Sequence, residues 1–169
     1  MQIEILRLNH RIFRDKRIST HVALTGRAFH STNLYYTGQK DSEMEESVNK
    51  ITKKFGGNFK IMHIKDDVKL IEEKKKENFK ILHLTMYGVS FKDKNFSKES
   101  KLLIIIGGEK VEPHIYRLSD HNISVTYQPI SEVSALGIFL YSIVGIKDEF
   151  ANSKVEVTPS ERGKFLNQS

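Results

Sequence analysis

The chain of 169 residues is 38% hydrophobic and 28% charged, with a formal net charge of +6; this fits one globular domain and excludes a collagen-like or largely disordered chain. It contains no cysteine, which excludes a disulfide scaffold, a cysteine nucleophile and an iron–sulfur cluster. No apolar stretch reaches the ~18 residues of a membrane span, and Arg7 interrupts the first apolar run, so we expect a soluble, cytoplasmic protein without a signal peptide.

The first half of the chain alternates between strand-like and helix-like patterns. Residues 3–8 alternate as a strand does, and Ser19 or Thr20 can cap a helix over 21–29. A short strand is expected at 33–37. Ser42 and Glu45 then form a capping-box pattern before a helix that ends at the glycines 56 and 57. A strand at 59–64 and a charged helix at 67–77 follow, and lysines 74–76 of that helix are expected to face solvent.

The second half has clearer strand patterns. Strands are predicted at 80–84, 102–106 and 123–127, and the unbroken apolar run 102–106 is typical of a central parallel strand covered on both faces. Ser131 can cap a helix over 133–144, and 154–157 is expected to form an edge strand. The polar tail beyond about residue 159 is expected to be loosely ordered. The pattern predicts a single α/β domain over 1–169, with a mostly parallel sheet flanked by helices.

Three segments follow predicted strands, at the edge where open α/β sheets bind their ligands. They are 84–88, 107–111 and 126–132, and they contain glycines and the start of a helix. Neither the GxGxxG pattern nor a P-loop is present, which disfavours a classical Rossmann dehydrogenase and a P-loop NTPase. No spacing of histidines and carboxylates indicates a metal site.

Arginine is concentrated near the N-terminus, whereas lysine is spread along the chain. Five of the seven arginines lie in the first 27 residues: Arg7, Arg11, Arg14, Arg17 and Arg27. A guanidinium group binds phosphate through two parallel hydrogen bonds, so this cluster favours contact with RNA over an ordinary solvated face. Arg27 lies in a predicted helix, where it could instead extend along the surface or pair with an acid.

Short motifs along most of the chain carry a family resemblance. They are Arg7-Leu8-Asn9-His10-Arg11 with Arg14-Asp15-Lys16-Arg17 and Thr20-His21-Val22-Ala23-Leu24; His83-Leu84-Thr85-Met86-Tyr87-Gly88; Gly107-Gly108-Glu109-Lys110-Val111; and Gln128-Pro129 followed by Ser131-Glu132-Val133. In this order they resemble the archaeal tRNA (cytidine-56)-2'-O-methyltransferases, which belong to the SPOUT class of knotted methyltransferases. The resemblance extends over residues 3–164. It departs from the usual family residues at Asn9, Gly26, His30, Tyr127 and Ile130.

The resemblance implies a fold with a deep C-terminal trefoil knot, a homodimer, S-adenosyl-L-methionine as cofactor and tRNA as partner. The reaction implied is methylation of the ribose of cytidine 56 in the T-loop. The cofactor-binding residues implied by the matched motifs are Leu84, Gly107, Gly108, Glu109, Lys110, Val111, Val125, Thr126, Tyr127, Gln128, Pro129, Ile130, Ser131 and Glu132.

The implied chemistry requires a ribose 2'-hydroxyl to become a nucleophile, which needs orientation and help in losing its proton. Arg11, Arg17 and Arg27 are the predicted catalytic residues, and His10 and His21 are possible bases. Two other functions remain open at this stage. A non-catalytic RNA-binding module would bind tRNA regardless of the cofactor, and a related SPOUT enzyme would methylate another tRNA position.

Overall fold

The computed structural model describes residues 1–108 and 110–168, apart from the side chain of Lys16. Its main element is a six-stranded sheet with the strand order β3-β2-β1-β5-β4-β6. Every adjacent pair in this sheet is parallel, which confirms the predicted parallel α/β class. The strands are β1 (Gln2–His10), β2 (Asn33–Gly38), β3 (Lys60–His63), β4 (Lys80–Ser90), β5 (Lys101–Ile106) and β6 (His121–Ser124).

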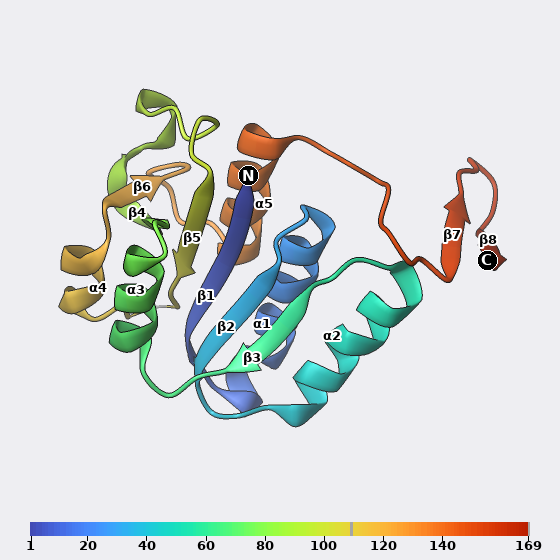
Figure 1. Cartoon of the computed structure of the whole chain (residues 1–169), viewed down its shortest axis with the longest axis horizontal. Helices are drawn as coiled ribbons and strands as arrows, with labels where there is room; N and C mark the ends of the chain where they lie inside the picture. Colours follow the sequence, from blue (N-terminus) through green and yellow to red (C-terminus); the bar gives the residue numbers. More distant parts are fainter. Residues whose placement is uncertain (109, 169) are drawn as a thin grey trace.

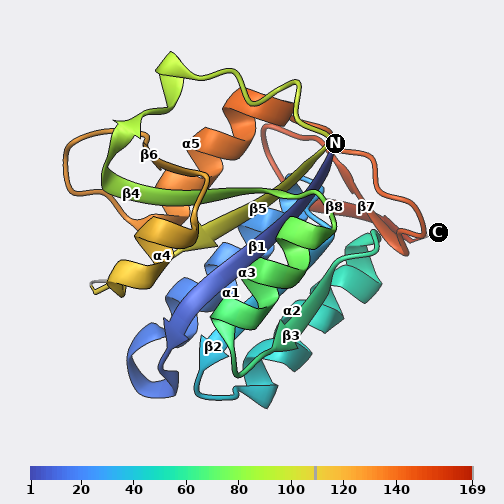
Figure 2. The same cartoon turned by 60° about the vertical axis from the view of Figure 1, so that its left-hand side comes forward.

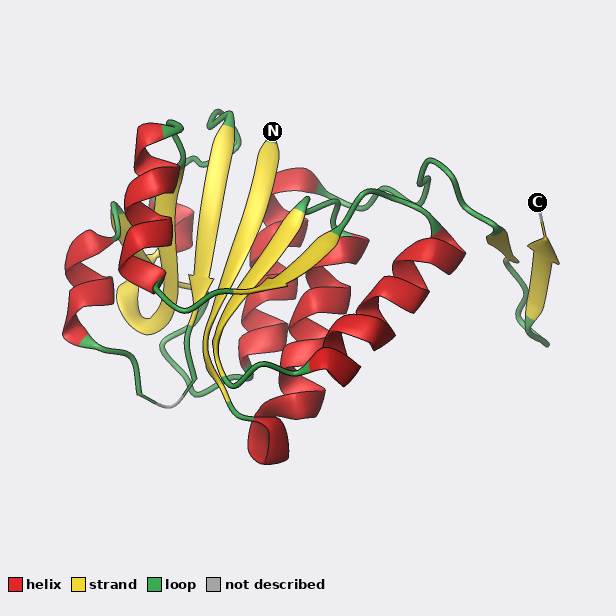
Figure 3. Cartoon of the chain, turned by 60° about the horizontal axis from the view of Figure 1, so that its bottom comes forward, coloured by secondary structure: helices red, strands yellow, loops and turns green. Residues whose placement is uncertain are grey.

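Helices cover both faces of this sheet (Figures 1, 2 and 3). Helices α1 (Ile12–Ala28), α2 (Ser42–Phe55) and α5 (Glu132–Val144) lie on one face, and α3 (Asp67–Lys76) and α4 (Pro113–Leu118) lie on the other. A 3₁₀ turn, η1 (Phe91–Asp93), follows β4. Strand β5 supplies both layers of the core, because Leu102, Ile104 and Ile106 join one apolar cluster while Leu103 and Ile105 join the other. The prediction that 102–106 is a central strand covered on both faces is therefore confirmed.

Several predicted boundaries change in the first half of the chain. Helix α1 begins at Ile12, well before the predicted cap, and Ser19 is fully buried inside it. The cap of α2 is Asp41 rather than Ser42, since the Asp41 carboxylate accepts a hydrogen bond from the Met44 backbone N–H at 2.9 Å. Gly56 ends α2 with a φ of 78°, a conformation that favours glycine.

In the second half, β4 extends to Ser90 and β6 ends at Ser124, so residues 125–127 leave the sheet as a loop rather than as a strand. The short helix α4 was not predicted, because its few residues carry too little periodicity. Ser131 does cap α5: its hydroxyl accepts from the Ser134 backbone N–H at 3.4 Å.

One lysine that was expected to face solvent is buried. Lys74 of α3 lies against β1, with its Nζ atom 3.0 Å from Glu4 Oε2 and 2.9 Å from Glu77 Oε2. Burial alone would lower the pKa of Lys74, but hydrogen bonds to Glu77 and Glu4 outweigh it and raise that pKa. A paired ammonium group is tolerated under a sheet, whereas an isolated one is not.

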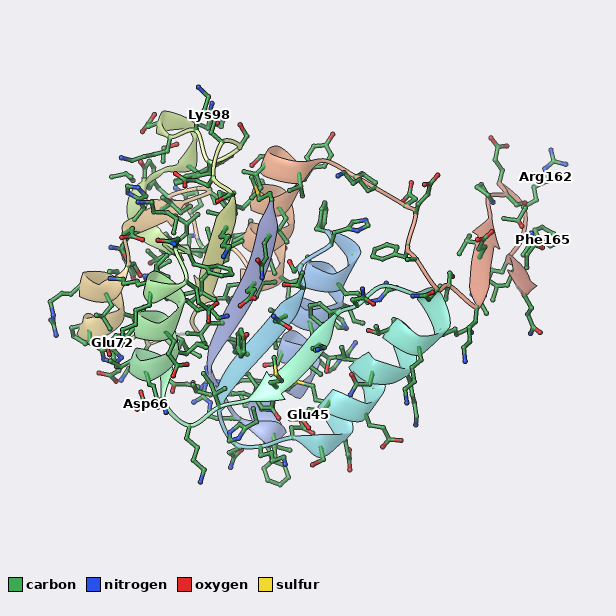
Figure 4. All side chains as sticks on the ribbon, in the orientation of Figure 1. Glu45, Asp66, Glu72, Lys98, Arg162 and Phe165 are labelled. Carbon is green, nitrogen blue, oxygen red and sulfur yellow. The ribbon has the colours of Figure 1, made fainter. Side chains whose placement is uncertain are left out.

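The chain after α5 forms an arm, residues 145–168, that leaves the main body (Figure 1). Its end is an antiparallel hairpin of β7 (Val155–Thr158) and β8 (Phe165–Gln168). The strand predicted at 154–157 forms as β7, but it pairs with β8 rather than with the edge of the six-stranded sheet. The tail, which was expected to be loosely ordered, contains the strand β8. Figure 4 shows Arg162 and Phe165 on this hairpin, away from the six-stranded sheet.

The arm is attached through Phe150. Its ring stacks on His30 with a centroid separation of 4.2 Å, and the Arg27 guanidinium lies 4.6 Å from the ring centroid. The backbone N–H of Gly57 also donates to the Ala151 carbonyl at 2.8 Å. None of the helices among the described residues is both long and apolar enough to cross a bilayer.

Candidate active site

A cavity of about 400 Å³ opens at the carboxyl ends of β4, β5 and β6. Each of the three segments picked out in the sequence contributes to its walls. The lining residues are Arg11, Arg14, Asp15, His83, Leu84, Thr85, Met86, Tyr87, Ile106, Gly107, Gly108, Val111, Tyr116, Ile123, Val125, Thr126, Pro129, Ile130, Glu132 and Ala135. Its size and mixed lining are typical of small-molecule pockets.

Most of the predicted cofactor residues meet in this cavity. Those that line it are Leu84, Gly107, Gly108, Val111, Val125, Thr126, Pro129, Ile130 and Glu132. Lys110 lines a neighbouring cavity instead. Tyr127, Gln128 and Ser131 are exposed and are not part of the described lining. Glu109 lies outside the described residues.

The loop after β5 requires a glycine at its first position. A β-carbon on Gly107 would overlap the Val111 side chain, which folds back over it. Gly107 therefore lets the Val111 side chain pack directly against the backbone, next to the apolar wall formed by Leu84, Ile106 and Val125.

Some of the lining residues could not be found from local pattern. Tyr116 of α4 reaches the cavity and lies with its hydroxyl 3.3 Å from Thr85 Oγ1, and Ile123 enters from β6. Asp15 of α1 and Ala135 of α5 also line the cavity. Residues 85–87 were within a segment flagged by its place after a strand, so their position was detectable.

A second cavity of about 600 Å³ adjoins the first. It is lined by Asn9, His10, Arg11, Arg14, Asp15, Gly38, Gln39, Gly108, Lys110 and Glu112. Arg11, Arg14, Asp15 and Gly108 line both cavities, so the start of α1 forms the boundary between them. Asn9, at this edge, has a φ of 54°, a left-handed conformation that asparagine and glycine tolerate better than other residues.

The boundary between the cavities is electrically charged. Arg11 Nε donates to Asp15 Oδ2 at 3.0 Å, one helical turn away. Burial by itself raises the pKa of Asp15, but the hydrogen bond from Arg11 and the positive charges of Arg11, Arg7 and Arg14 hold it below the ordinary value. Asp15 is therefore ionised at neutral pH and orients the Arg11 guanidinium.

The three predicted catalytic arginines do not come together. Arg11 lines both cavities, while Arg17 is exposed further along α1 and is absent from the described lining of either. Arg27 lies at the other end of α1, roughly 24 Å away at 1.5 Å per residue. Its Nη2 donates to the Gly56 carbonyl at 2.7 Å, so Arg27 holds the arm and the end of α2, and the catalytic assignment is not supported.

The surroundings of His10 argue against the predicted role as a base, because both of its ring nitrogens have partners. Its Nδ1 lies 2.9 Å from Ser19 Oγ and its Nε2 lies 3.3 Å from Asp41 Oδ2. This resembles a hydrolase triad in composition, but Ser19 and His10 are fully buried and Asp41 is 3% exposed, so no substrate reaches the hydroxyl. Burial lowers the pKa of His10, and the three residues serve to join β1, α1 and α2. His21, the other possible base, is exposed on α1 and outside both described linings.

His83 is held in place by a hydrogen bond with Asn122. It is fully buried, and its Nδ1 lies 2.9 Å from Asn122 Oδ1. Asn122 Nδ2 donates to the Tyr116 carbonyl, which orients the amide so that His83 Nδ1 carries the proton. Burial lowers the pKa of His83, so the ring is neutral at pH 7. Among the described residues, no group of three or more histidine, aspartate or glutamate side chains could hold a metal ion.

Comparison with known proteins identifies the family of this chain. Residues 55–167 match the family model described as tRNA ribose 2'-O-methyltransferase, aTrm56. The chain is 41% identical over 173 residues to the tRNA (cytidine(56)-2'-O)-methyltransferase of Methanobrevibacter smithii, covering 99% of this chain and 96% of that protein. The Archaeoglobus fulgidus protein of the same name is 44% identical over 168 residues, covering 97% of each chain. The Thermoplasma volcanium protein, also of that name, is 47% identical over 96% of this chain, which spans 48% of that relative's length.

Solved structures agree on the fold. A TrmH/SpoU tRNA modifying enzyme of A. aeolicus matches with a TM-score of 0.65 at 20% identity, over 84% of this chain and 73% of that one. The SpoU methyltransferase AviRb of Streptomyces viridochromogenes, solved in complex with AdoMet, matches with a TM-score of 0.65 at 13% identity, over 85% of this chain and 57% of that one. Together with the extent of the family match, these findings show that the chain belongs to the aTrm56 family of tRNA ribose 2'-O-methyltransferases.

Proposed function

We propose that this chain transfers the methyl group of S-adenosylmethionine to the ribose 2'-hydroxyl of cytidine 56 in the T-loop of tRNA. The observation that carries the proposal is the joining of two cavities at one charged boundary. One is a small-molecule pocket built from the loops after β4, β5 and β6, and the other is flanked by Arg11, Arg14 and Lys110. The relatives named above carry this activity in their names.

The first cavity fits S-adenosylmethionine in size and chemistry. Its wall combines apolar side chains, which suit an adenine ring, with Glu132 and Thr126, which can accept hydrogen bonds from amino and hydroxyl groups. The glycine turn at Gly107 brings the backbone close to whatever occupies the cavity. When bound, S-adenosylmethionine supplies an electrophilic methyl group on a positively charged sulfur.

The protein's own contribution is orientation and electrostatics. With the cofactor held in the first cavity, the ribose 2'-hydroxyl would accept the methyl group, S-adenosylhomocysteine would be the leaving group, and the hydroxyl proton would pass to solvent. Arg11, fixed by Asp15, places positive charge where the oxygen becomes negative, which favours loss of that proton. Arg14 and Lys110 offer positive charge to the phosphates on either side of the target ribose. Arg17, exposed on the same helix, extends this positive surface toward the RNA.

We extend the proposal to the trefoil knot implied by the resemblance. Ile123 of β6 pairs with both Leu84 and Val89 of β4, so residues 85–88 bulge around the end of β6. A β-carbon on Gly88 would clash with the backbone of Asn122 and Ile123. The chain then passes from α4 on one face of the sheet, through β6, to α5 on the opposite face (Figure 2). This close contact between the β4 bulge and the strand that leads to α5 supports the proposed threading.

We also propose a homodimer formed through α5. Ile138 and Tyr141 of this helix are 45% and 59% exposed, and Ile146 just beyond it is 69% exposed. Large apolar side chains grouped on one helix favour an interface. Light scattering of the purified protein should give twice the chain mass, and Tyr141→Lys should shift it toward the monomer; a monomeric wild type would contradict the proposal.

The methyl-transfer proposal is tested with labelled S-adenosylmethionine and two tRNA substrates. One is unmodified, and the other carries a 2'-deoxycytidine at position 56 and so lacks the accepting oxygen. Label is expected at cytidine 56 of the first tRNA and in neither ribose nor base of the second. Label that persists in the deoxy substrate would place the methyl group elsewhere and contradict the proposal.

A further inference from the structure

A buried arginine beneath the cofactor cavity has no part in the mechanism above. Arg7 lies near the end of β1, in register with Ile106 of β5, and its side chain is 1% exposed. It is not among the described lining residues of either cavity, so any effect on a bound cofactor or RNA would pass through its neighbours. A guanidinium group carries five N–H donors, and burying its charge is unfavourable unless those donors are used.

The N–H donors of Arg7 make few and long hydrogen-bonding contacts. Its Nε lies 3.5 Å from Ser19 Oγ, at the limit of a hydrogen bond, and its Nη2 lies 3.6 Å from Glu132 Oε1. Its Nη1 is buried and has no hydrogen-bond partner. Burial lowers the pKa of Arg7, and the nearby carboxylates of Glu132 and Asp15 partly oppose this. An apolar side chain of similar length would be more favourable at this place if packing were its purpose.

The surroundings of the guanidinium indicate its role. The β-carbon position of Gly108 is 3.7 Å from both Nη1 and Nη2, so the head of Arg7 lies directly below the loop after β5. Glu132, its carboxylate partner, is the first residue of α5 and follows the loop after β6. Gly108 and Glu132 both line the cofactor cavity. Arg7 is therefore placed between the loops after β5 and β6, both of which line the cavity.

We propose that Arg7 is a positioning residue of the cofactor site, which holds the Gly107–Gly108 turn and the Glu132 carboxylate in the arrangement that binds S-adenosylmethionine. This rests on the proposed function, since it assigns the cavity to that cofactor. Arg7 acts through Glu132: without the guanidinium, the partly exposed carboxylate loses its fixed orientation toward the cavity.

The test is a double-mutant cycle read by calorimetric binding of S-adenosylmethionine to the full chain. Arg7→Met and Glu132→Gln are each expected to weaken binding by about tenfold, and the double variant is expected to weaken it little beyond either single variant. Arg7→Lys keeps the charge but not the planar fork and should retain part of the affinity. Losses that multiply in the double variant, or an Arg7→Met affinity within about twofold of wild type, would overturn the proposal.

The matched control is Lys74, another buried basic residue, which lies in α3 and does not line the cavity. Lys74→Met should lower the melting temperature without changing cofactor affinity, so a general loss of stability is separated from loss of positioning. If Arg7→Met does not fold, Glu132→Gln and Arg7→Lys decide the matter, and unchanged affinity in both would refute the role. The proposed function is judged separately, by methyl transfer to tRNA in the wild type.

Discussion

Arg11 and Asp15 form a hydrogen-bonded ion pair of 3.0 Å at the first turn of α1, and both residues line the two adjoining cavities. Arg14 and Gly108 also line both cavities, so the pair lies where the two cavities meet. A guanidinium fixed in this way is oriented before any substrate arrives, which is the condition under which electrostatic stabilisation is most effective.

Replacing Arg11 should therefore damage the reaction more than the binding of either substrate. Arg11→Ala is expected to lower kcat for tRNA methylation by about 100-fold, since one preorganised donor is lost. Steady-state methylation of a tRNA transcript measures this. Arg117→Ala, an exposed arginine on α4, serves as the matched control and should leave kcat unchanged; an Arg11→Ala kcat equal to that of the control would contradict the role.

The loop after β6 offers a paired test of the cofactor cavity. Ile130 lines the cavity, whereas Tyr127 in the same loop is 61% exposed and is not part of the described lining. Ile130→Asp should weaken S-adenosylmethionine binding by roughly tenfold or more, because an apolar wall becomes charged. Tyr127→Asp should have little effect on binding. Equal losses from both substitutions would show that the cavity is not where the cofactor binds.

The turn after β5 should not tolerate a side chain. In Gly107→Ala the added carbon would overlap Val111, which must move and carry the loop with it. Calorimetry should show weaker S-adenosylmethionine binding with only a modest change in melting temperature. Gly137→Ala is the control: its new β-carbon would lie 3.8 Å from Thr25 in ordinary contact, so cofactor affinity should be unchanged.

Acid should destabilise the fold through its buried histidines. Burial lowers the pKa of both His10 and His83, so the unfolded chain takes up protons at a higher pH than the folded one. Stability from these groups is complete above pH ~6.5 and is lost as the pH falls below it, by up to about 1.4 kcal/mol per pH unit for each histidine. Thermal unfolding between pH 7 and pH 5 measures this, and His83→Asn should make the dependence shallower. A melting temperature that rises on acidification would contradict the assignment.

The arm should detach when its aromatic anchor is removed. Phe150→Ala loses the stacking on His30 and the contact with Arg27, each worth about 1 kcal/mol, so trypsin cleavage at Lys154 should accelerate by roughly tenfold. Phe165→Ala, on the exposed hairpin, is the control and should not accelerate it. Cleavage that is equally fast in the control would mean that Phe150 does not hold the arm.

The sequence pattern alone predicted those elements in which the same kind of burial continues over several residues. The run 102–106 predicted a strand covered on both faces, and β5 lies between β1 and β4 with its side chains in both core clusters. Ser131 was predicted to cap a helix and does so. Nine of the residues that the matched motifs assign to cofactor binding line one cavity, because each motif follows a strand of the same parallel sheet.

Partners that lie far apart in the chain were decided by the tertiary structure alone. Lys74 is buried because Glu4, seventy residues earlier, lies beneath it, and no pattern within α3 shows this. Arg27, at the far end of α1, contacts Phe150 of the arm and donates a hydrogen bond to the Gly56 carbonyl at the end of α2. Arg7 is placed under two loops by the order of the strands. Periodicity reports which face of a segment is buried, whereas the partner of a buried charge depends on which distant segments pack together, and only the folded chain determines that.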